Sequence, residues 1–158
     1  MLAIAAAVRE VPQANASFDR DALVLHPDVN VSVAIDTPWG LVVLALFRTL
    51  TLTVIAESPQ EIVDLACEDR LELRHSEGAP IDVSNLGTQG TDSGTALVTI
   101  PRGAVVFVGA IRDEVIVVDG DIGVRPMIRV SCAFDHPVLE RATAVRFTAV
   151  VRRELELP

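Results

Sequence analysis

The sequence predicts one α/β domain that contains more strand than helix. The chain has 158 residues, which is the size of one ordinary domain with a core of its own. Half of the residues are hydrophobic, chiefly Ala, Val, Leu and Ile, and only 4% are aromatic. Several segments alternate apolar and polar residues, as half-buried strands do, whereas fewer segments have the pattern of a helix. These observations exclude a disordered chain and favour a Val-rich sheet covered by a few helices.

Helix-start and turn residues divide the N-terminal half into elements. Leu2–Val11 is rich in Ala and predicts a helix that Pro12 ends. The apolar run Leu2–Val8 has no basic n-region and no clear cleavage site, so we interpret it as part of the fold and not as a signal sequence. Ser58-Pro59-Gln60-Glu61 is typical of a helix start, and this helix should run to about Arg70. The strands predicted in this half are Asp21–His26, Val29–Ile35 and Leu41–Val54.

The C-terminal half consists mainly of predicted strands. Asp119-Gly120 lies between two apolar runs and predicts a hairpin turn. A helix over Val138–Leu155 closes the chain. The strands predicted here are Asp82–Leu86, Gly103–Ile111, Val115–Val118, Ile122–Val124 and Met127–Phe134.

The charged residues exclude several classes of function. Thirteen basic and 22 acidic residues give a net charge of −9, which disfavours a nucleic-acid partner or an anionic membrane surface. The longest apolar stretch is about half of the ~18 residues that a membrane-spanning helix needs. All thirteen basic residues are Arg, so residues 1–158 contain no lysine that could carry a lipoyl group or a biotin or form a Schiff base.

The cysteines and the apolar content bear on metal binding, location and assembly. Cys67 and Cys132 form no CxxC motif and no Cys/His cluster, so we expect no metal site. Two buried reduced thiols are typical of a cytoplasmic protein. The apolar excess fits either an oligomer interface or a buried Val-rich sheet, and the composition does not separate the two.

Two short segments contain candidate catalytic residues. His136 follows a predicted buried strand, with Asp135 before it and Glu140 four residues on. A histidine held at a strand end can act as a general base, although a structural histidine is the more common case. Ser84 and Asn85 end another strand beside a glycine-rich stretch, where a hydroxyl can donate to an oxyanion or satisfy a turn. His26 and His75 have no partner spacing, so we expect structural or solvated roles for them.

Longer segments resemble the catalytic core of the dihydrolipoamide acyltransferases of 2-oxo acid dehydrogenase complexes. The segments that carry the resemblance are VREVPQANASF (8–18), HPDVNVSVAIDTPWGLVV (26–43), IDVSNLGTQG (81–90) and IVVDGDIGVRPMIRVSCAFDH (116–136). The separation of 52 positions from Ser84 to His136 also fits the family's spacing. The resemblance implies a chloramphenicol acetyltransferase-like two-layer sandwich with a mixed sheet, over a single domain at 1–158. It also implies a trimer, a unit from which a larger shell can be built.

The same resemblance implies the chemistry of a thioester acyltransferase. His136 would be the base that deprotonates a thiol, and Ser84 of a neighbouring subunit would hydrogen-bond the oxyanion. Asp135, Glu140 and Asn85 would support the site. Coenzyme A and a lipoyl or phosphopantetheine arm would be co-substrates, with no covalently bound cofactor. The implied partners are a thiamine-diphosphate-dependent dehydrogenase-like protein and a separate lipoyl domain or acyl carrier protein.

The chain also departs from the family pattern. The family signature D-H-R-x-x-D-G is Asp135-His136-Pro137-Val138-Leu139-Glu140-Arg141 here. The resemblance further implies a core that is shortened at its N-terminus and lacks a lipoyl or partner-binding domain. Two hypotheses therefore stand: an acyltransferase, favoured by the retained Ser84 and His136, and a catalytically inactive oligomeric scaffold that assembles the partner enzyme and carrier.

Overall fold

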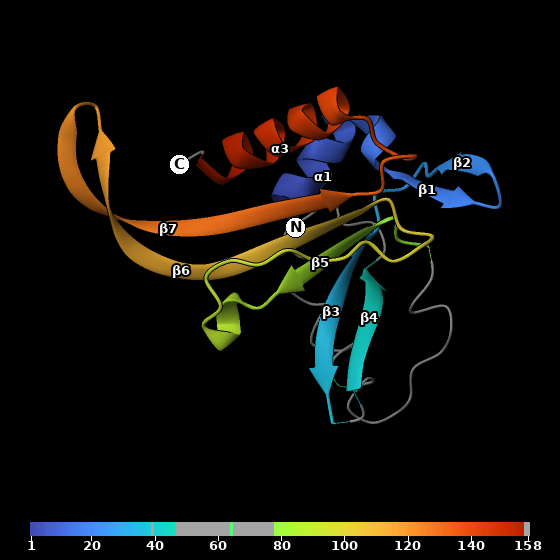
Figure 1. Ribbon diagram of the computed structural model, residues 1–158, viewed down its shortest axis with the longest axis horizontal. Helices are drawn as coiled ribbons and strands as arrows, with labels where there is room; N and C mark the ends of the chain where they lie inside the picture. Colours follow the sequence, from blue (N-terminus) through green and yellow to red (C-terminus); the bar gives the residue numbers. More distant parts are fainter. Residues whose placement is uncertain (39, 47–63, 65–77, 157–158) are drawn as a thin grey trace.

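The computed structural model describes residues 1–38, 40–46, 64 and 78–156 (Figure 1). Two longer helices lie near its two ends, α1 (Leu2–Glu10) and α3 (Arg141–Glu156). The strands are β1 (Ala16–Asp19), β2 (Ala22–Leu25), β3 (Val31–Thr37), β4 (Gly40–Leu46), β5 (Ile81–Asn85), β6 (Ala104–Val118) and β7 (Asp121–Phe134). Short 3-10 turns, η1 (Pro12–Ala14) and η3 (Gly87–Gln89), follow α1 and β5. Within the described ranges, no helix is long and apolar enough to cross a bilayer.

Five strands form one mixed sheet in the order β4-β3-β5-β6-β7. β5 is parallel to both of its neighbours, and the two outer pairs, β3–β4 and β6–β7, are antiparallel. The separate hairpin β1–β2 lies beside the end of the sheet at which β6 begins (Figure 1). A bulge between Val108 and Ile111 shifts the register of β6 against β7.

Both helices cover the same face of the sheet and bury the core against it (Figure 1). Phe147 of α3 is fully buried and meets Phe134 of β7 edge to face, with ring centroids 5.7 Å apart. Such a pair contributes stability beyond that of burying the two rings, so it holds α3 over the end of β7. The core residues that α1 and the central strands contribute are Ile4, Ala7, Val8, Val31, Ile81, Val83, Ala104 and Val106.

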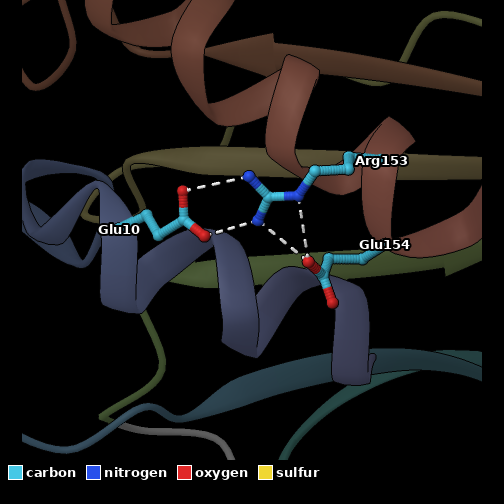
Figure 2. Close-up of polar contacts among 3 residues, drawn as sticks. All are labelled: Glu10, Arg153 and Glu154. Atoms are coloured by element: carbon cyan, nitrogen blue, oxygen red, sulfur yellow. Dashed lines mark hydrogen bonds and ion pairs between the residues drawn. The ribbon is translucent and has the colours of Figure 1, made fainter. Parts of the chain in front are cut away.

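An ion pair at the surface joins the two helices (Figure 2). Both carboxylate oxygens of Glu10 accept hydrogen bonds from the Arg153 guanidinium, and Arg153 also donates to Glu154 over 2.9 Å. The hydrogen bond from Arg153 lowers the pKa of Glu10. Because these side chains are half exposed, solvent screens the pair, which therefore orients the helices more than it stabilises them.

The main elements predicted from the sequence are confirmed, with some corrections. Asp119 and Gly120 have φ angles of 53° and 91°, as a two-residue hairpin turn requires. The four short strands predicted around this turn are two continuous strands, because ladder hydrogen bonds use the backbone and continue past polar side chains. Strand β1 was not predicted, and α3 begins three residues later than predicted.

Other predictions fall on residues that the structure does not describe. Apart from Asp64, which is helical, the predicted helix over Ser58–Arg70 lies outside the described residues. The part of the predicted strand Leu41–Val54 after residue 46, and the side chains of Cys67 and His75, lie outside them as well.

Candidate functional site

Ser84 lies near the carboxyl end of β5 and is half-buried. It alternates with Val83, which faces the helices, so its hydroxyl lies on the opposite face of the sheet. Asn85 follows and is exposed, and its Oδ1 accepts a hydrogen bond from the Gly87 amide over 3.1 Å. The Asn85 side chain therefore stabilises the turn after β5, and Ser84 is the polar group that this strand end can offer to a ligand.

His136 lies in a tight turn between β7 and α3. The Asp135 amide donates to the Gly103 carbonyl over 2.9 Å, and the Asp135 carbonyl accepts from the amides of Val138 and Leu139. Val138 and Leu139 are buried, whereas His136 is exposed and has no hydrogen-bond partner among the described residues. The turn is thus anchored on both sides and presents the His136 ring to whatever binds there.

Asp135 and Glu140 contribute to the same turn in different ways. Asp135 is half-buried and uses its backbone to close the turn. Glu140 is exposed, and its carbonyl accepts the first hydrogen bonds of α3, from the amides of Thr143 and Ala144. The Glu140 carboxylate therefore sits at the N-terminal end of a helix, where the helix dipole favours negative charge.

A single chain does not bring Ser84 and His136 together. Ser84 pairs with Phe107 of β6, and Phe107 pairs with Ser131 of β7, three residues before Phe134. With strands about 4.8 Å apart and a rise of about 3.3 Å per residue, roughly 14 Å separates the backbones of Ser84 and Phe134. His136 follows Phe134 in the turn beyond. The two predicted catalytic groups thus belong to different regions of the chain surface.

A buried polar cluster near these groups was not predicted from the sequence. Asp82 of β5 accepts a hydrogen bond from Ser32 and forms an ion pair with Arg102, with Nε and Oδ1 2.6 Å apart. Desolvation by burial raises the pKa of Asp82, while Ser32 and Arg102 act in the opposite direction. The available signal was a carboxylate between the apolar residues Ile81 and Val83, and a carboxylate is costly to bury without a partner.

Among the hollows in the described part of the chain are two that neither Ser84 nor His136 lines. The smaller, of about 480 Å³, lies beneath the β1–β2 hairpin and is lined partly by Arg102. There Ser17 Oγ lies 2.9 Å from His26 Nε2, and burial lowers the pKa of His26. The contact with Ser17 supports the structural role expected of His26. The larger hollow, of about 800 Å³, is a groove between β7 and α3.

Metal ligands do not gather in the described residues, which contain no group of three or more His, Cys, Asp or Glu side chains able to hold an ion. Cys132 lies on β7 beside the groove, and burial raises the pKa of its thiol to about 11. A thiol of that pKa is almost entirely protonated at neutral pH and is a poor ligand or nucleophile.

Comparison with known proteins places the whole chain in one group. The family model "2-oxoacid dehydrogenases acyltransferase (catalytic domain)" matches residues 1–158. The chain is 32% identical to the dihydrolipoyllysine-residue acetyltransferase component of the pyruvate dehydrogenase complex of Mycoplasma genitalium, over 98% of this chain and 41% of that protein. The chain therefore spans about two fifths of the length of the curated relatives it matches.

Solved structures agree with this assignment. The chain is similar to the dihydrolipoamide acetyltransferase of Azotobacter vinelandii and to the cubic core of a pyruvate dehydrogenase multienzyme complex. Each match has a TM-score of 0.89 and 30% identity, and covers 98% of this chain and 65% of that chain. A chloramphenicol acetyltransferase matches at a TM-score of 0.58 and 17% identity, which shows the fold alone. The predicted chloramphenicol acetyltransferase-like fold with a mixed sheet is confirmed.

Proposed function

Because the chain belongs to the acyltransferase family of 2-oxoacid dehydrogenase complexes, we propose that it transfers acyl groups between thiols. The donor in this proposal is a lipoyl or phosphopantetheine thioester on another polypeptide segment. Residues 1–158 contain no lysine that could hold a lipoyl group. The acceptor is coenzyme A or an acyl carrier protein. A thiamine-diphosphate-dependent dehydrogenase-like partner supplies the acyl group, in the cytoplasm.

In this proposal His136 and Ser84 act on one reacting carbonyl. The His136 imidazole accepts the proton of the acceptor thiol, and the thiolate attacks the carbonyl carbon of the donor thioester. Ser84 donates a hydrogen bond to the oxyanion that forms. The oxyanion then collapses, the bond to the carrier sulfur breaks, and His136 returns its proton to that sulfur. A general base contributes about 10²–10⁴-fold to such a rate, and one oxyanion donor about 10²–10³-fold.

The observation that carries the proposal is the placement of Ser84 and His136 on anchored elements that do not meet within one chain. Two groups of one mechanism that lie apart in a protomer can meet across an interface between copies. Asp135 and Glu140 support the His136 side through the turn, and Asn85 supports the Ser84 side through its bond to Gly87. The site therefore requires an assembly, which we propose is a homotrimer.

The β6–β7 ribbon offers a surface for that assembly. Beyond the bulge the two strands extend past the rest of the chain (Figure 1). One face of this ribbon continues the face that α3 covers nearer Phe134, but α3 ends at Glu156, beside the region of Met127 and Ile128. The large apolar side chains left exposed on this face are Ile111 (72%), Val115 (71%), Val117 (69%), Ile122 (78%) and Val124 (57%).

Such a ribbon is marginal alone, because a two-stranded sheet has no core of its own. A patch of branched apolar side chains of this kind marks a protein–protein contact. In this proposal a second copy of the chain covers the patch. The similarity to a protein that forms a cubic core supports an oligomeric state.

A second candidate function is a scaffold without catalysis. Pro137 and Arg141 stand where the family signature has Arg and Gly, and both side chains are exposed. A scaffold would retain the ribbon interface and the partner enzyme while lacking transferase activity.

The test is transfer from acyl-lipoamide, or from an acyl-loaded carrier protein, to coenzyme A, compared between wild type and His136→Ala. We expect the variant to lose at least about 100-fold in kcat. Equal trace rates in the two proteins would exclude the acyltransferase and leave the scaffold.

Mixing subunits tests whether the site lies between chains. His136→Ala and Ser84→Ala proteins are unfolded together and refolded as mixed assemblies. In a trimer with random mixing, about a quarter of the interfaces combine an intact His136 with an intact Ser84 of the neighbour. Activity should recover toward that fraction of wild type. A mixture no more active than its separate components would mean that both groups act from one chain.

A further inference from the structure

We propose that the buried Asp82–Arg102 ion pair is a positioning device that holds the His136 turn in register with the strand that carries Ser84. This inference rests on the proposed function. The Nε atom of Arg102 lies 2.6 Å from Oδ1 of Asp82, and the two side chains are only 17% and 12% exposed. Asp82 is held in turn by Ser32 of β3, which donates to the same oxygen.

Backbone hydrogen bonds connect the ion pair to the turn that contains His136. Arg102 immediately precedes Gly103, whose amide donates to the Pro80 carbonyl over 2.9 Å. The Gly103 carbonyl accepts the Asp135 amide over the same distance, and Asp135 precedes His136. One peptide unit therefore separates the anchored arginine from the hydrogen bond that closes the turn.

The same pair reaches Ser84 along β5. Asp82 and Ser84 are two residues apart in this strand, so their side chains share one face. In the proposed assembly Ser84 serves one site while His136 of the same chain serves the neighbouring site. The position of Ser84 relative to His136 within one subunit then determines whether the sites at its two interfaces can both form.

Gly103 explains why a charged anchor is used at this position. A Cβ atom there would collide with the Ala16 carbonyl and lie 2.8 Å from Cγ1 of Val138, so the segment must run flat between β1 and the turn. A residue without a side chain cannot fix its own position by packing. Arg102 provides the fixed point, and a buried ion pair is better suited to specifying one geometry than to stabilising the fold.

The test is a double-mutant cycle with Asp82→Asn and Arg102→Gln. Three quantities are measured for each protein: kcat and KM for acyl transfer, hydrogen exchange at the Asp135 amide, and the melting temperature. The matched control is the Arg112–Asp92 pair, which joins β6 to the loop before it and is about half exposed on both sides. Its variants are Arg112→Gln and Asp92→Asn.

Each single change should lower kcat about tenfold with little change in KM, because displacement by a fraction of an ångström misaligns a base. Exchange at the Asp135 amide should quicken about tenfold, while amides of the β3–β4 ladder keep their rates. The double variant should be no worse than either single variant, since the two changes remove one interaction. Arg102→Lys should restore part of kcat, and it serves as the folded variant if Arg102→Gln does not fold.

The inference is overturned if Asp135 exchange and kcat respond no more than in the control pair, or if the effects of the two substitutions add. A uniform rise in exchange across all amides, with a matching loss of melting temperature, would also overturn it. An inactive wild type whose Asp135 amide still responds to the substitutions would refute the proposed function but support the role of the ion pair in holding the turn.

Discussion

Replacing Val115 by Asp tests the assembly surface on the β6–β7 ribbon. Val115 is 71% exposed in the single chain and lies on the same face as its partner Val124. A polar residue at this position removes nothing from the core of one subunit. The substitution should therefore leave the fold of the subunit intact and act on the contact between copies.

The expected magnitude follows from the exposed fractions. Complete burial of a Val or Ile side chain is worth about 1.5–2 kcal/mol, so covering the five exposed side chains of the ribbon face contributes roughly 6 kcal/mol per copy. Val115 accounts for about 1 kcal/mol of this, and a carboxylate in the apolar contact costs several kcal/mol more. A total loss of at least about 3 kcal/mol weakens association by more than roughly 100-fold.

Sedimentation velocity and native mass spectrometry over a range of protein concentrations measure the change. The control is Leu97→Asp, because Leu97 is 89% exposed and lies outside the ribbon. We expect the control to assemble like wild type and Val115→Asp to dissociate at concentrations where wild type is assembled. If Val115→Asp assembles at the same concentration as wild type, the ribbon is not the contact surface.

Three further predictions concern stability and reactivity. Phe147→Ala should lower the free energy of unfolding by about 3–5 kcal/mol in urea titrations, because it empties a fully buried site against Phe134, whereas Val145→Ala, exposed on the same helix, should cost less than about 0.5 kcal/mol. An equal loss in both would contradict the packing described. Cys132, with a pKa of about 11, should react with iodoacetamide at pH 8 about 200-fold more slowly than a free cysteine peptide, as peptide mapping by mass spectrometry would show. Rapid labelling would mean that the thiol is not buried. Burial lowers the pKa of His26, so in the range between the folded and unfolded pKa values the folded protein binds fewer protons than the unfolded chain. The free energy of unfolding is therefore highest above about pH 6.5, and part of it is lost as the pH falls through the folded pKa. The melting temperature of wild type should drop over that range and that of His26→Gln should drop less; parallel curves would refute the assignment.

Local sequence patterns were sufficient to predict the elements whose boundaries depend on residues adjacent in the sequence. The Ala-rich run before Pro12 predicted α1, and Asp119-Gly120 predicted the hairpin turn, because helix termination and positive φ angles depend on the residues at that position. The resemblance in the segments around Ser84 and His136 predicted the family and the fold that the comparisons confirm. The role of these two residues stays a prediction that the activity and mixing experiments test.

Only the tertiary structure decided how distant segments combine. The parallel pairings of β5 with β3 and β6 join segments far apart in the sequence, so no local pattern specifies them. The Asp82–Arg102 contact and the distance between Ser84 and His136 follow from those pairings, as does the ribbon face that α3 leaves exposed. The physical reason is that side-chain periodicity assigns a residue to a face of its own strand, whereas the partner of that face is set by the packing of the whole chain.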